Sequence, residues 1–384
     1  MRRICVITGS RAEYGALSSF LKLAQKSTIL DIKLVVTGMH LSKEFGSTYK
    51  RIEEDGYNIT KKVDILLSSD TDVSIVKSTG IAMINFSEIF SELKPDIVFI
   101  VGDRFEMFAV AYAAAMLKIP IAHCAGGEVT VGATDEFIRH SITKMSWWHF
   151  VATEKYKNRV IQLGEAKERI FNIGALGLDL LSKNFLLSKK DLEKQINFNF
   201  GEKNLLITYH PVTQEKYSSG KQFDELLKSL KRFKGVKYIF TSPNSDSGGK
   251  IIDEKIDNFV NNNKNQSIKI ISMGSKNYLS SLQFVDGVVG NSSSGIVEVP
   301  SFKIGTVNIG ERQKGRIKSE SVIDCIPKSR EITNAINLIT SESFKDSIKQ
   351  IKNPYGDGKA AEKIIQILEK TEIPKNLKKY FYDL

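Results

Sequence analysis

The feature that most constrains the fold of this chain is a regular alternation of short apolar runs with longer amphipathic stretches. Runs such as DIVFIVG are apolar almost throughout, as expected for strands that helices cover on both faces. Strands that alternate with helices of this length indicate βαβ units and a parallel sheet. In the first half, the predicted strands are Ile4–Thr8, Ile32–Thr37, Ile97–Val101, Ile119–Ala122, His149–Ala152 and Ile170–Ile173. The predicted helices between them are Gly15–Gln25, Thr48–Glu54, Ile75–Leu93, Phe105–Leu117, Thr134–Lys144 and Glu154–Leu163.

A polar, lysine-rich stretch from Leu180 to about Lys203 interrupts this alternation, which then resumes. The chain has 384 residues, too many for one ordinary core, so two domains are expected. We predict an α/β fold with two Rossmann-like doubly wound domains, over residues 1–180 and 181–365, and a tail over 366–384. Such domains bind ligands at the carboxyl ends of their strands, in the cleft between them. The predicted strands of the second half are Leu205–Tyr209, Tyr238–Thr241, Ile268–Ile271, Val285–Val289 and Gly305–Ile309, and AAEKIIQILEKTEI predicts a final helix.

Composition narrows the class of protein. Hydrophobic residues make up 41% of the chain and charged residues 26%, which is typical of soluble globular proteins. No apolar run approaches the roughly 20 residues that span a bilayer, and the apolar run at the N-terminus is too short for a secretory signal. We therefore expect a cytoplasmic protein with no membrane partner. The three cysteines, Cys5, Cys124 and Cys325, are far apart and indicate neither a zinc site nor a disulfide framework.

The formal net charge of +11 leaves three interpretations open. A lysine-rich, solvated surface explains it most simply, while an acidic small substrate or a nucleic acid would also suit a basic protein. The lysines are dispersed, with many acidic residues between them, and no basic stripe alternates with aromatic residues. This pattern argues against a nucleic-acid partner.

Two loops after predicted strands of the first half carry charged residues. In TGSRAEYG, Arg11 follows the first strand and would lie at its carboxyl end, although a generic turn with a solvated arginine explains it equally well. In VGDRFE, Asp103 follows the most apolar strand, where partial desolvation raises a carboxyl pKa and suits proton transfer. An aspartate that caps the helix starting near Phe105 is the alternative, and both roles are compatible.

The stretch GGEVTVGATDEFIRHS follows another strand and is rich in charge. Thr134 suits the N-cap of a helix, and the helix dipole favours ionised carboxylates in the first turn, at Asp135 and Glu136. Asp135 and Arg139 are four residues apart and are expected to pair on one helical face. Capping alone would explain each acid, but the combination suits elimination chemistry on a sugar, which needs a base, an acid and groups that organise them. The set comprises His123, Glu128, Asp135, Glu136, Arg139 and His140.

Three motifs of the second half also follow strands. In TYHPVT, His210 is a candidate proton carrier or a candidate hydrogen-bond donor to a phosphate. A structural histidine is the alternative. In GNSSSGIVEVP, free backbone N–H groups and hydroxyls at a helix start form a candidate phosphate cradle, with Glu298 one turn on to accept from a ribose. A serine-rich capped turn is the alternative, and no Walker motif is present. The cations of GERQKGR, Gly310 to Arg316, would neutralise a diphosphate or belong to an exposed basic loop.

Taken in order, these motifs resemble one family. GSRAEYG, VTGMHLS, GDRFE, GGE, DEFIRHSITKMS, GNSSSGIVEVP, GERQKGR and NPYGDG are similar to motifs of the hydrolysing UDP-N-acetylglucosamine 2-epimerases of bacterial sialic acid synthesis, from Arg3 to about Leu368. The resemblance implies a fold like that of the B-type glycosyltransferases, with the last helix packed on the first domain, and a homodimer. It also implies that UDP-N-acetylglucosamine and water give N-acetylmannosamine and UDP. Anti elimination to 2-acetamidoglucal is followed by hydration, with no metal, nicotinamide or other cofactor.

The same resemblance assigns roles to individual residues. Asp103, Asp135, Arg139 and His210 match catalytic positions, but the sequence has Ala125 where many relatives carry a further glutamate. Glu128, in the same turn, is the candidate replacement. The segment Ser272–Tyr278 looks like the loop that faces the nucleobase. The residues expected to bind substrate are Arg11, Glu136, Ser292, Ser293, Ser294, Gly295, Glu298 and Arg312.

The motifs leave the substrate open. UDP-N-acetylglucosamine is the substrate that we expect first. Related enzymes of legionaminic acid synthesis with nearly the same motifs act on a UDP- or GDP-linked 2,4-diacetamido-2,4,6-trideoxyglucose, and the motifs do not report the substituents at C4 and C6. A B-type glycosyltransferase would share the fold and the phosphate cradle but would require an acceptor. A non-catalytic nucleotide-sugar sensor would have no need of Asp103 and Asp135 together.

Overall fold

The computed structural model divides into two compact units, which are described separately. It describes the whole chain except residues 68–70, 131–133, 182–185, 212–218, 244–248 and 272. The first unit comprises Met1–Glu128, Thr134–Leu180 and Tyr355–Leu384, and the second comprises Val129–Ala133 and Leu181–Pro354. The expected limit of the second domain at residue 365 therefore differs from the observed division, because the last thirty residues belong to the first unit.

The first unit is built on a seven-stranded parallel sheet in the order β3-β2-β1-β4-β5-β6-β7. In the central pairs, Ile4 lies beside Ile32 of β2 and Ile97 of β4. The chain changes direction across the sheet between β1 and β4, which is the switch point where ligands bind in folds of this type. The strands are β1 (Arg2–Thr8), β2 (Leu30–Thr37), β3 (Ile59–Val63), β4 (Ile97–Val101), β5 (Ile121–Cys124), β6 (Trp148–Val151) and β7 (Ile170–Asn172).

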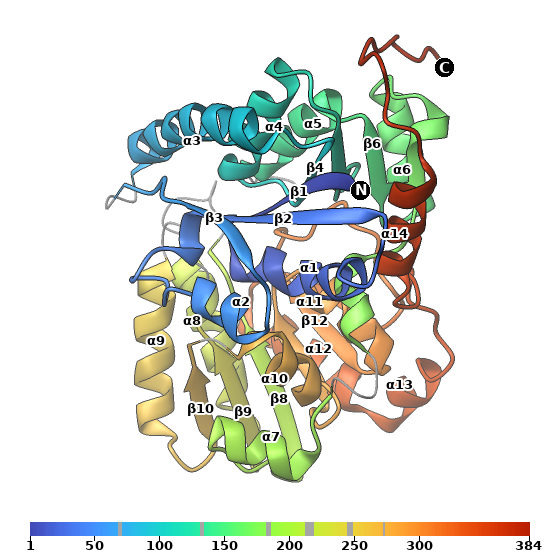
Figure 1. Ribbon diagram of the computed structural model, residues 1–384. Coiled ribbons are helices and arrows are strands. Elements are labelled where there is room, and N and C mark those ends of the chain that lie inside the picture. Colours follow the sequence, from blue (N-terminus) through green and yellow to red (C-terminus); the bar gives the residue numbers. More distant parts are fainter. Residues whose placement is uncertain (68–70, 131–133, 182–185, 212–218, 244–248, 272) are drawn as a thin grey trace. The chain divides into compact units, whose positions relative to one another are not determined.

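Helices cover both faces of this sheet (Figure 1). Phe86 and Met107 belong to the core under α3 and α4, whereas Phe20 and Ile364 belong to the core under α1 and α14. Burial on both faces explains why β4 is apolar at every position. The helices are α1 (Arg11–Ala24), η1 (Gly38–His40), α2 (Tyr49–Glu54), α3 (Asp72–Leu93), α4 (Phe105–Met116), α5 (Asp135–Met145), α6 (Glu154–Gln162), η2 (Lys167–Arg169), η3 (Leu176–Leu181) and α14 (Ala360–Lys370).

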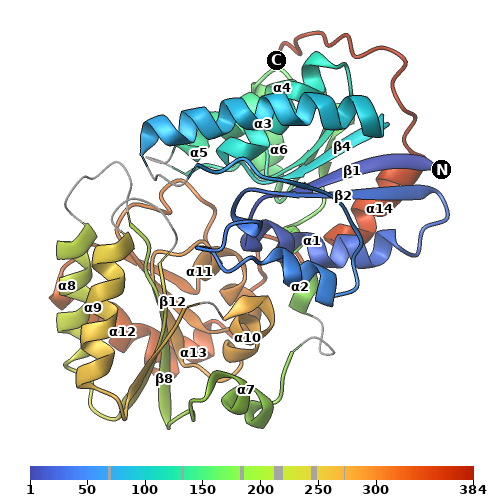
Figure 2. The same ribbon diagram turned by 60° about the vertical axis from the view of Figure 1, so that its left-hand side comes forward.

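The second unit contains a six-stranded parallel sheet in the order β10-β9-β8-β11-β12-β13. Its core packs residues of α8, α9 and α12 against the sheet, and these helices line one side of it in Figure 2. The strands are β8 (Lys203–Thr208), β9 (Val236–Thr241), β10 (Ser267–Ile270), β11 (Gly287–Gly290), β12 (Gly305–Ile309) and β13 (Val322–Cys325). The helices are α7 (Lys189–Ile196), α8 (Ser219–Leu230), α9 (Gly249–Asn262), α10 (Gly274–Ser281), α11 (Ser294–Val297), η4 (Val299–Phe302), α12 (Ser329–Thr340) and α13 (Glu342–Ser347).

The two doubly wound parallel sheets confirm the predicted fold class, and all eleven predicted strands are present within a few residues. The largest shift is at β5, which begins at Ile121 because Pro120 has no N–H group for the ladder. Two strands were missed, β3 and β13. Each lies at the edge of its sheet and is only partly buried, so neither is an apolar run. The predicted connector contains a helix, α7, and its residues 182–185 lie outside the described part of the chain.

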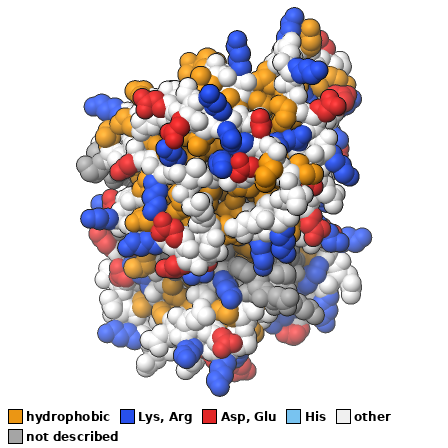
Figure 3. All heavy atoms as spheres, in the orientation of Figure 1, with side chains coloured by type: hydrophobic (Ala, Val, Ile, Leu, Met, Phe, Trp, Pro, Cys, Tyr) orange, Lys and Arg blue, Asp and Glu red, His pale blue; other side chains and the backbone are white. Residues whose placement is uncertain are grey.

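The surface agrees with the dispersed charge of the sequence. On the face drawn in Figure 3, lysine and arginine side chains alternate with aspartate and glutamate, and no continuous basic stripe is visible. Within the described ranges, none of the helices combines the length and the apolar character that crossing a membrane requires.

Candidate active site

Asp103 and Arg104 follow the most deeply buried strand of the first unit. β4 is buried at all five positions, and Gly102 then adopts a positive φ of 92°, a conformation that favours glycine. The turn places Asp103 beyond the strand with its side chain 21% exposed. Arg104, not Asp103, is the N-cap residue of α4, and its side chain accepts no capping hydrogen bond. The capping alternative for Asp103 is therefore wrong, which leaves its carboxylate for other partners.

Arg139 of α5 gathers the acidic groups of this unit. Its guanidinium is 1% exposed, and Nε and Nη2 lie 2.7 and 2.6 Å from Asp103 Oδ2. Nη1 donates to Glu136 Oε2 over 2.7 Å and to the backbone oxygen of Glu128 over 2.9 Å. Burial lowers the pKa of Arg139, but the carboxylates of Asp103, Glu128 and Glu136 raise it overall. The arginine is therefore a fixed charge that joins the first turn of α5 to the turns that follow β4 and β5.

α5 begins at Asp135, as predicted within one residue, and carries Asp135 and Glu136 in its first turn. The Thr134 side chain makes no capping hydrogen bond. Asp135 is half-buried, and its charge acts on the Arg104 guanidinium. His140, also partly exposed, has Nε2 3.2 Å from Glu136 Oε1. The first turn of α5 thus brings together the acids that the sequence predicted.

The turn after β5 is shaped by close backbone contacts. Ala125 has a φ of 88°, and Gly127 has a φ of 76°. A Cβ on Gly127 would lie 2.3 Å from the backbone oxygen of Tyr156, so only glycine fits there. His123 is fully buried, its Nε2 lies 2.9 Å from the Gly102 oxygen, and burial lowers its pKa to about 4. A neutral His123 therefore ties this turn to the turn that precedes Asp103.

Sequence reasoning missed two buried carboxylates of the first unit. Glu13 completes a capping box with Ser10 at the start of α1, a signal that the spacing S-x-x-E provides. Glu106, in the first turn of α4, is 1% exposed, and its Oε1 lies 2.9 Å from Arg104 Nε. Arg11, the first residue of α1, is exposed at the carboxyl end of β1, as predicted.

In the second unit, His210 is held by Asn291 across two strands. The backbone N–H of His210 donates to Asn291 Oδ1 over 2.7 Å, and Asn291 Nδ2 donates to the His210 oxygen over 2.8 Å. Asn291 is fully buried, and its own backbone oxygen accepts from Arg312 Nη1 at 3.2 Å and from Gln313 Nε2 at 2.9 Å. Burial, and then the Arg312 charge, lower the pKa of His210 to about 3, so the imidazole is neutral near pH 7.

The serine-rich turn follows β11 as predicted. Ser292 Oγ accepts from the Ser294 N–H at 3.4 Å, and α11 then spans only Ser294–Val297. A Cβ on Gly295 would lie 2.7 Å from Thr306 Cγ2 of β12, so this glycine allows the turn to pack closely on the sheet. Ser293 precedes α11 and Glu298 follows it, both half-buried.

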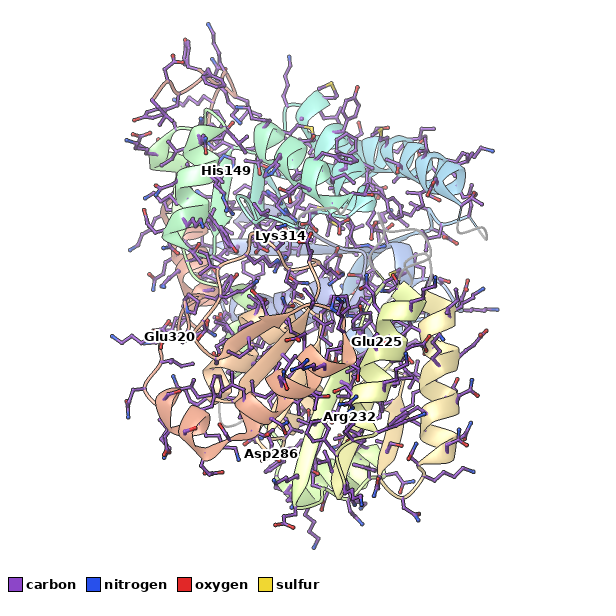
Figure 4. The ribbon with its side chains drawn as sticks, turned by 180° about the vertical axis from the view of Figure 1, so that it is seen from behind. His149, Glu225, Arg232, Asp286, Lys314 and Glu320 are labelled. Atoms are coloured by element: carbon purple, nitrogen blue, oxygen red, sulfur yellow. The ribbon has the colours of Figure 1, made fainter. Side chains whose placement is uncertain are left out.

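Two further predicted segments differ in how much of them the structure describes. The loop after β12 contains Arg312 and the exposed Lys314, which is labelled in Figure 4. The proposed nucleobase loop begins at Ser272, which lies outside the described residues, and continues into α10 at Gly274. Across the described ranges, no group of three histidine, cysteine or acidic side chains is placed to hold a metal ion.

Comparison with known proteins places this arrangement in context. Residues 22–369 match the family model described as UDP-N-acetylglucosamine 2-epimerase. A Campylobacter jejuni protein, GDP/UDP-N,N'-diacetylbacillosamine 2-epimerase (hydrolyzing), is 42% identical over 100% of this chain and 99% of its own. The Escherichia coli polysialic acid biosynthesis protein P7 is 40% identical over 100% and 98%. The Legionella pneumophila UDP-N,N'-diacetylbacillosamine 2-epimerase (hydrolyzing) is 36% identical over 96% of each chain.

Solved structures agree on the fold. The structure of UDP-GlcNAc 2-epimerase from Neisseria meningitidis bound to UDP-GlcNAc superposes with a TM-score of 0.80 at 18% identity, and it covers 97% of this chain and 100% of its own. At this identity the likeness concerns the fold alone. It supports the predicted architecture like that of the B-type glycosyltransferases.

Proposed function

The chain belongs to the UDP-N-acetylglucosamine 2-epimerase family and is a hydrolysing nucleotide-sugar 2-epimerase, and we propose that its substrate is a nucleoside-diphosphate-linked N,N'-diacetylbacillosamine. This sugar is the 2,4-diacetamido-2,4,6-trideoxyglucose of the alternative that the sequence left open. Two of the three relatives described above carry this sugar in their names. The proposal therefore replaces UDP-N-acetylglucosamine as the first expectation. That substrate stays the second candidate, since the name of the protein P7 refers to polysialic acid synthesis.

The single observation that carries the chemistry is the set of carboxylates around Arg139. Loss of the C2 proton and of the nucleotide at C1 requires a base at one carbon and stabilised charge at the other. We assign the base and acid roles to Asp103 and Asp135, with Glu128 as a further candidate in place of the family glutamate. The Arg139 guanidinium lies 2.6 Å from the Asp103 carboxylate and holds it in a fixed orientation, which suits a base.

The second half of the reaction is the hydration of the glycal intermediate. Water adds to C1 as hydroxyl and to C2 as hydrogen, with inverted configuration at C2, and the free sugar is released. The same carboxylates supply and accept the two protons, so the set returns to its starting state. Each step balances without an oxidant or a reductant.

We propose that the second unit binds the nucleoside diphosphate. His210 is neutral and its backbone is fixed by Asn291, so its imidazole offers one donor and one acceptor nitrogen. Ser292, Ser293, Ser294 and Gly295 are the proposed phosphate contacts, with Arg11 and Arg312 as cations and Glu298 as the ribose contact. On this proposal the first unit supplies the carboxylates, including Glu136, and the enzyme works as a homodimer without a nucleic-acid or membrane partner.

A comparison of substrates tests the proposal. The enzyme is incubated with UDP- and GDP-N,N'-diacetylbacillosamine and with UDP-N-acetylglucosamine, and released nucleotide and free sugar are identified. We expect kcat/KM to be higher for a diacetylbacillosamine donor by about tenfold or more, the discrimination that one substituent in a pocket provides. A higher value for UDP-N-acetylglucosamine would overturn the assignment of the sugar but not the reaction class. The variants Asp103→Asn and Asp135→Asn are each expected to abolish nucleotide release while the protein stays folded.

A further inference from the structure

Two buried carboxyl groups lie at the carboxyl ends of central strands of the first unit, apart from the set around Arg139. Glu13 of α1 is 7% exposed and Glu106 of α4 is 1% exposed. Glu13 Oε1 and Glu106 Oε2 are buried and have no hydrogen-bond partner among the described residues. Buried polar atoms of native proteins are nearly always satisfied. These two oxygens therefore need a physical explanation.

The two carboxyl groups flank one residue, Gly9. The Gly9 N–H donates to Glu13 Oε2 over 2.7 Å, whereas a Cβ on Gly9 would lie 2.8 Å from Cγ and Oε1 of Glu106. A Cβ on Gly38 would lie 3.5 Å from Glu106 Oε1, and one on Gly102 would lie 3.5 Å from Glu13 Oε1. These three glycines directly follow β1, β2 and β4. The carboxyl groups thus fill the space that the glycines leave at the switch point of the sheet.

The charges of this group do not balance if both acids are ionised. Among the described residues, the cation in contact is Arg104, whose Nε lies 2.9 Å from Glu106 Oε1. Two buried carboxylates with one guanidinium leave an excess negative charge, and an uncompensated buried charge is strongly unfavourable. Burial and the neighbouring Glu106 carboxylate raise the pKa of Glu13, in keeping with a bound proton. One bound proton neutralises one of the two carboxylates and so removes the excess negative charge. It also converts a carboxyl oxygen that has no hydrogen-bond partner from an acceptor into a donor.

We propose that Glu13 and Glu106 share a single proton near pH 7 and act as one positioning unit, in which the Glu106 carboxylate holds Arg104 beside Asp103 and Asp135. The Glu106 carboxylate is the largest influence on Arg104 and raises its pKa. Burial lowers this pKa, and the charges of Glu13 and Asp135 raise it again. The charges of Arg104 and Asp135 act on each other, and Arg104 follows Asp103 directly in the chain, so on this proposal its orientation tunes the charge near both carboxylates.

Other charged groups around the pair are few in the described chain. The Asp103 carboxylate, like that of Glu106, raises the pKa of Glu13, whereas the Arg104 guanidinium lowers it. His40 of η1 lies 3.0 Å from Thr8 Oγ1 at the end of β1, and burial lowers its pKa to about 4, so it is neutral near pH 7. Arg11, on α1, is exposed, although partial burial lowers its pKa. None of these removes the excess charge of the pair.

The shared proton is tested without substrate. Infrared spectra of the wild-type protein and of Glu13→Gln near pH 7 are compared in the C=O stretching region of protonated carboxylic acids. We expect a band in the wild type that is missing in the variant. The variant keeps an oxygen to accept from Gly9 and an amide in place of the protonated oxygen. Identical spectra would overturn the shared proton, whatever the enzyme's substrate.

Stability against pH is the second substrate-free measurement. A carboxyl group with a raised pKa in the folded state stabilises the fold below the unfolded pKa, and that stability is lost as pH rises toward the folded pKa. The urea midpoint of the wild type should therefore fall relative to that of Glu13→Gln between about pH 4 and pH 8. The unfolded pKa of a glutamate is about 4.3, and burial and the neighbouring Glu106 raise the folded pKa of Glu13 to about 8. Parallel curves for the two proteins would contradict the proposal.

The positioning role rests on the proposed function and is tested by nucleotide release. Glu106→Gln should lower kcat by about tenfold or more, as expected when a charge-assisted hydrogen bond that orients a site group is lost. It should also move the acidic limb of the kcat profile to higher pH, because Arg104 is then no longer held beside the proposed catalytic carboxylates and stabilises their charge less. An unshifted profile would refute the positioning role. If no protein releases nucleotide, the proposed function fails and the two substrate-free measurements still decide the shared proton.

The matched control is another fully buried glutamate of the same unit, Glu165. It is bound by His149 of β6, labelled in Figure 4, at 3.1 Å and by Lys144 and Lys379 at 2.6 Å each. Glu165→Gln removes a buried charge from an ion-pair cluster outside the proposed site. It should lower stability and leave the pH profile of kcat in place. If Glu165→Gln shifts the pH profile of kcat as much as Glu106→Gln does, the shift is a general effect of losing a buried charge, and the positioning role of Glu106 is overturned.

Discussion

The guanidinium of Arg139 makes the sharpest prediction about stability. Arg139→Met removes the partner of Asp103 and Glu136 but keeps a side chain of similar length. Removal of one member of a buried ion pair costs about 3–5 kcal/mol, because the remaining charge is left uncompensated. The two carboxylates are 21% and 28% exposed and recover part of their hydration, so the lower end, about 3 kcal/mol, is expected. Urea unfolding followed by circular dichroism measures the difference.

Arg51 provides the matched control. It also pairs with two acids, Glu54 at 3.8 Å and Asp55 at 3.1 Å, but its side chain is 65% exposed. Arg51→Met should therefore cost no more than about 1 kcal/mol. Arg139→Lys should fall between the two methionine variants, because lysine keeps the charge but lacks the planar fork. If Arg139→Met and Arg51→Met lose the same stability, the view of Arg139 as the buried centre of this acidic set is wrong.

Two further variants test the turns that carry the site. Gly127→Ala places a Cβ 2.3 Å from the Tyr156 oxygen at a φ of 76° and should cost about 3 kcal/mol, from backbone strain and overpacking. Gly235→Ala is the control, because Gly235 has a φ of 73° but an added Cβ would have no atom within 4 Å, so only backbone strain is introduced. If both variants lose the same stability in urea unfolding, the packing argument for Gly127 is wrong. Asn291→Ala should lower kcat for nucleotide release by about tenfold or more by loosening the backbone that carries His210. An unchanged kcat would show that the two hydrogen bonds to His210 do not position it for catalysis.

The sequence predicted strands well where consecutive residues are all buried, because such strands are visible as apolar runs. β4 and β12 were predicted to the residue. β4 was recognisable because a strand covered on both faces is apolar throughout. The edge strand Ile59–Val63 was missed because its residues are polar and partly exposed. Edge strands take their place from the ladder of a neighbouring strand, here β2, rather than from their own composition.

The acidic set shows the same limit at the level of single residues. Spacing along one helix indicated a pair between Asp135 and Arg139, since residues four apart share a face. In the structure Glu136 of the same helix pairs with Arg139, and Asp103, thirty-six residues earlier, contacts the same guanidinium. No local pattern encodes this contact, because it depends on the parallel pairing of β4 and β5. The shared burial of Glu13 and Glu106 arises in the same way, from two helices that begin at neighbouring strands.

The central claim is that this enzyme removes the C2 proton and the nucleotide together and then releases the free sugar. Incubation with a diacetylbacillosamine nucleotide alone in heavy water tests it most directly. The account predicts nucleoside diphosphate together with free 2-epimeric sugar that carries one deuterium at C2. Release that occurs only when a sugar acceptor is added, or an epimer that keeps its nucleotide, would contradict it.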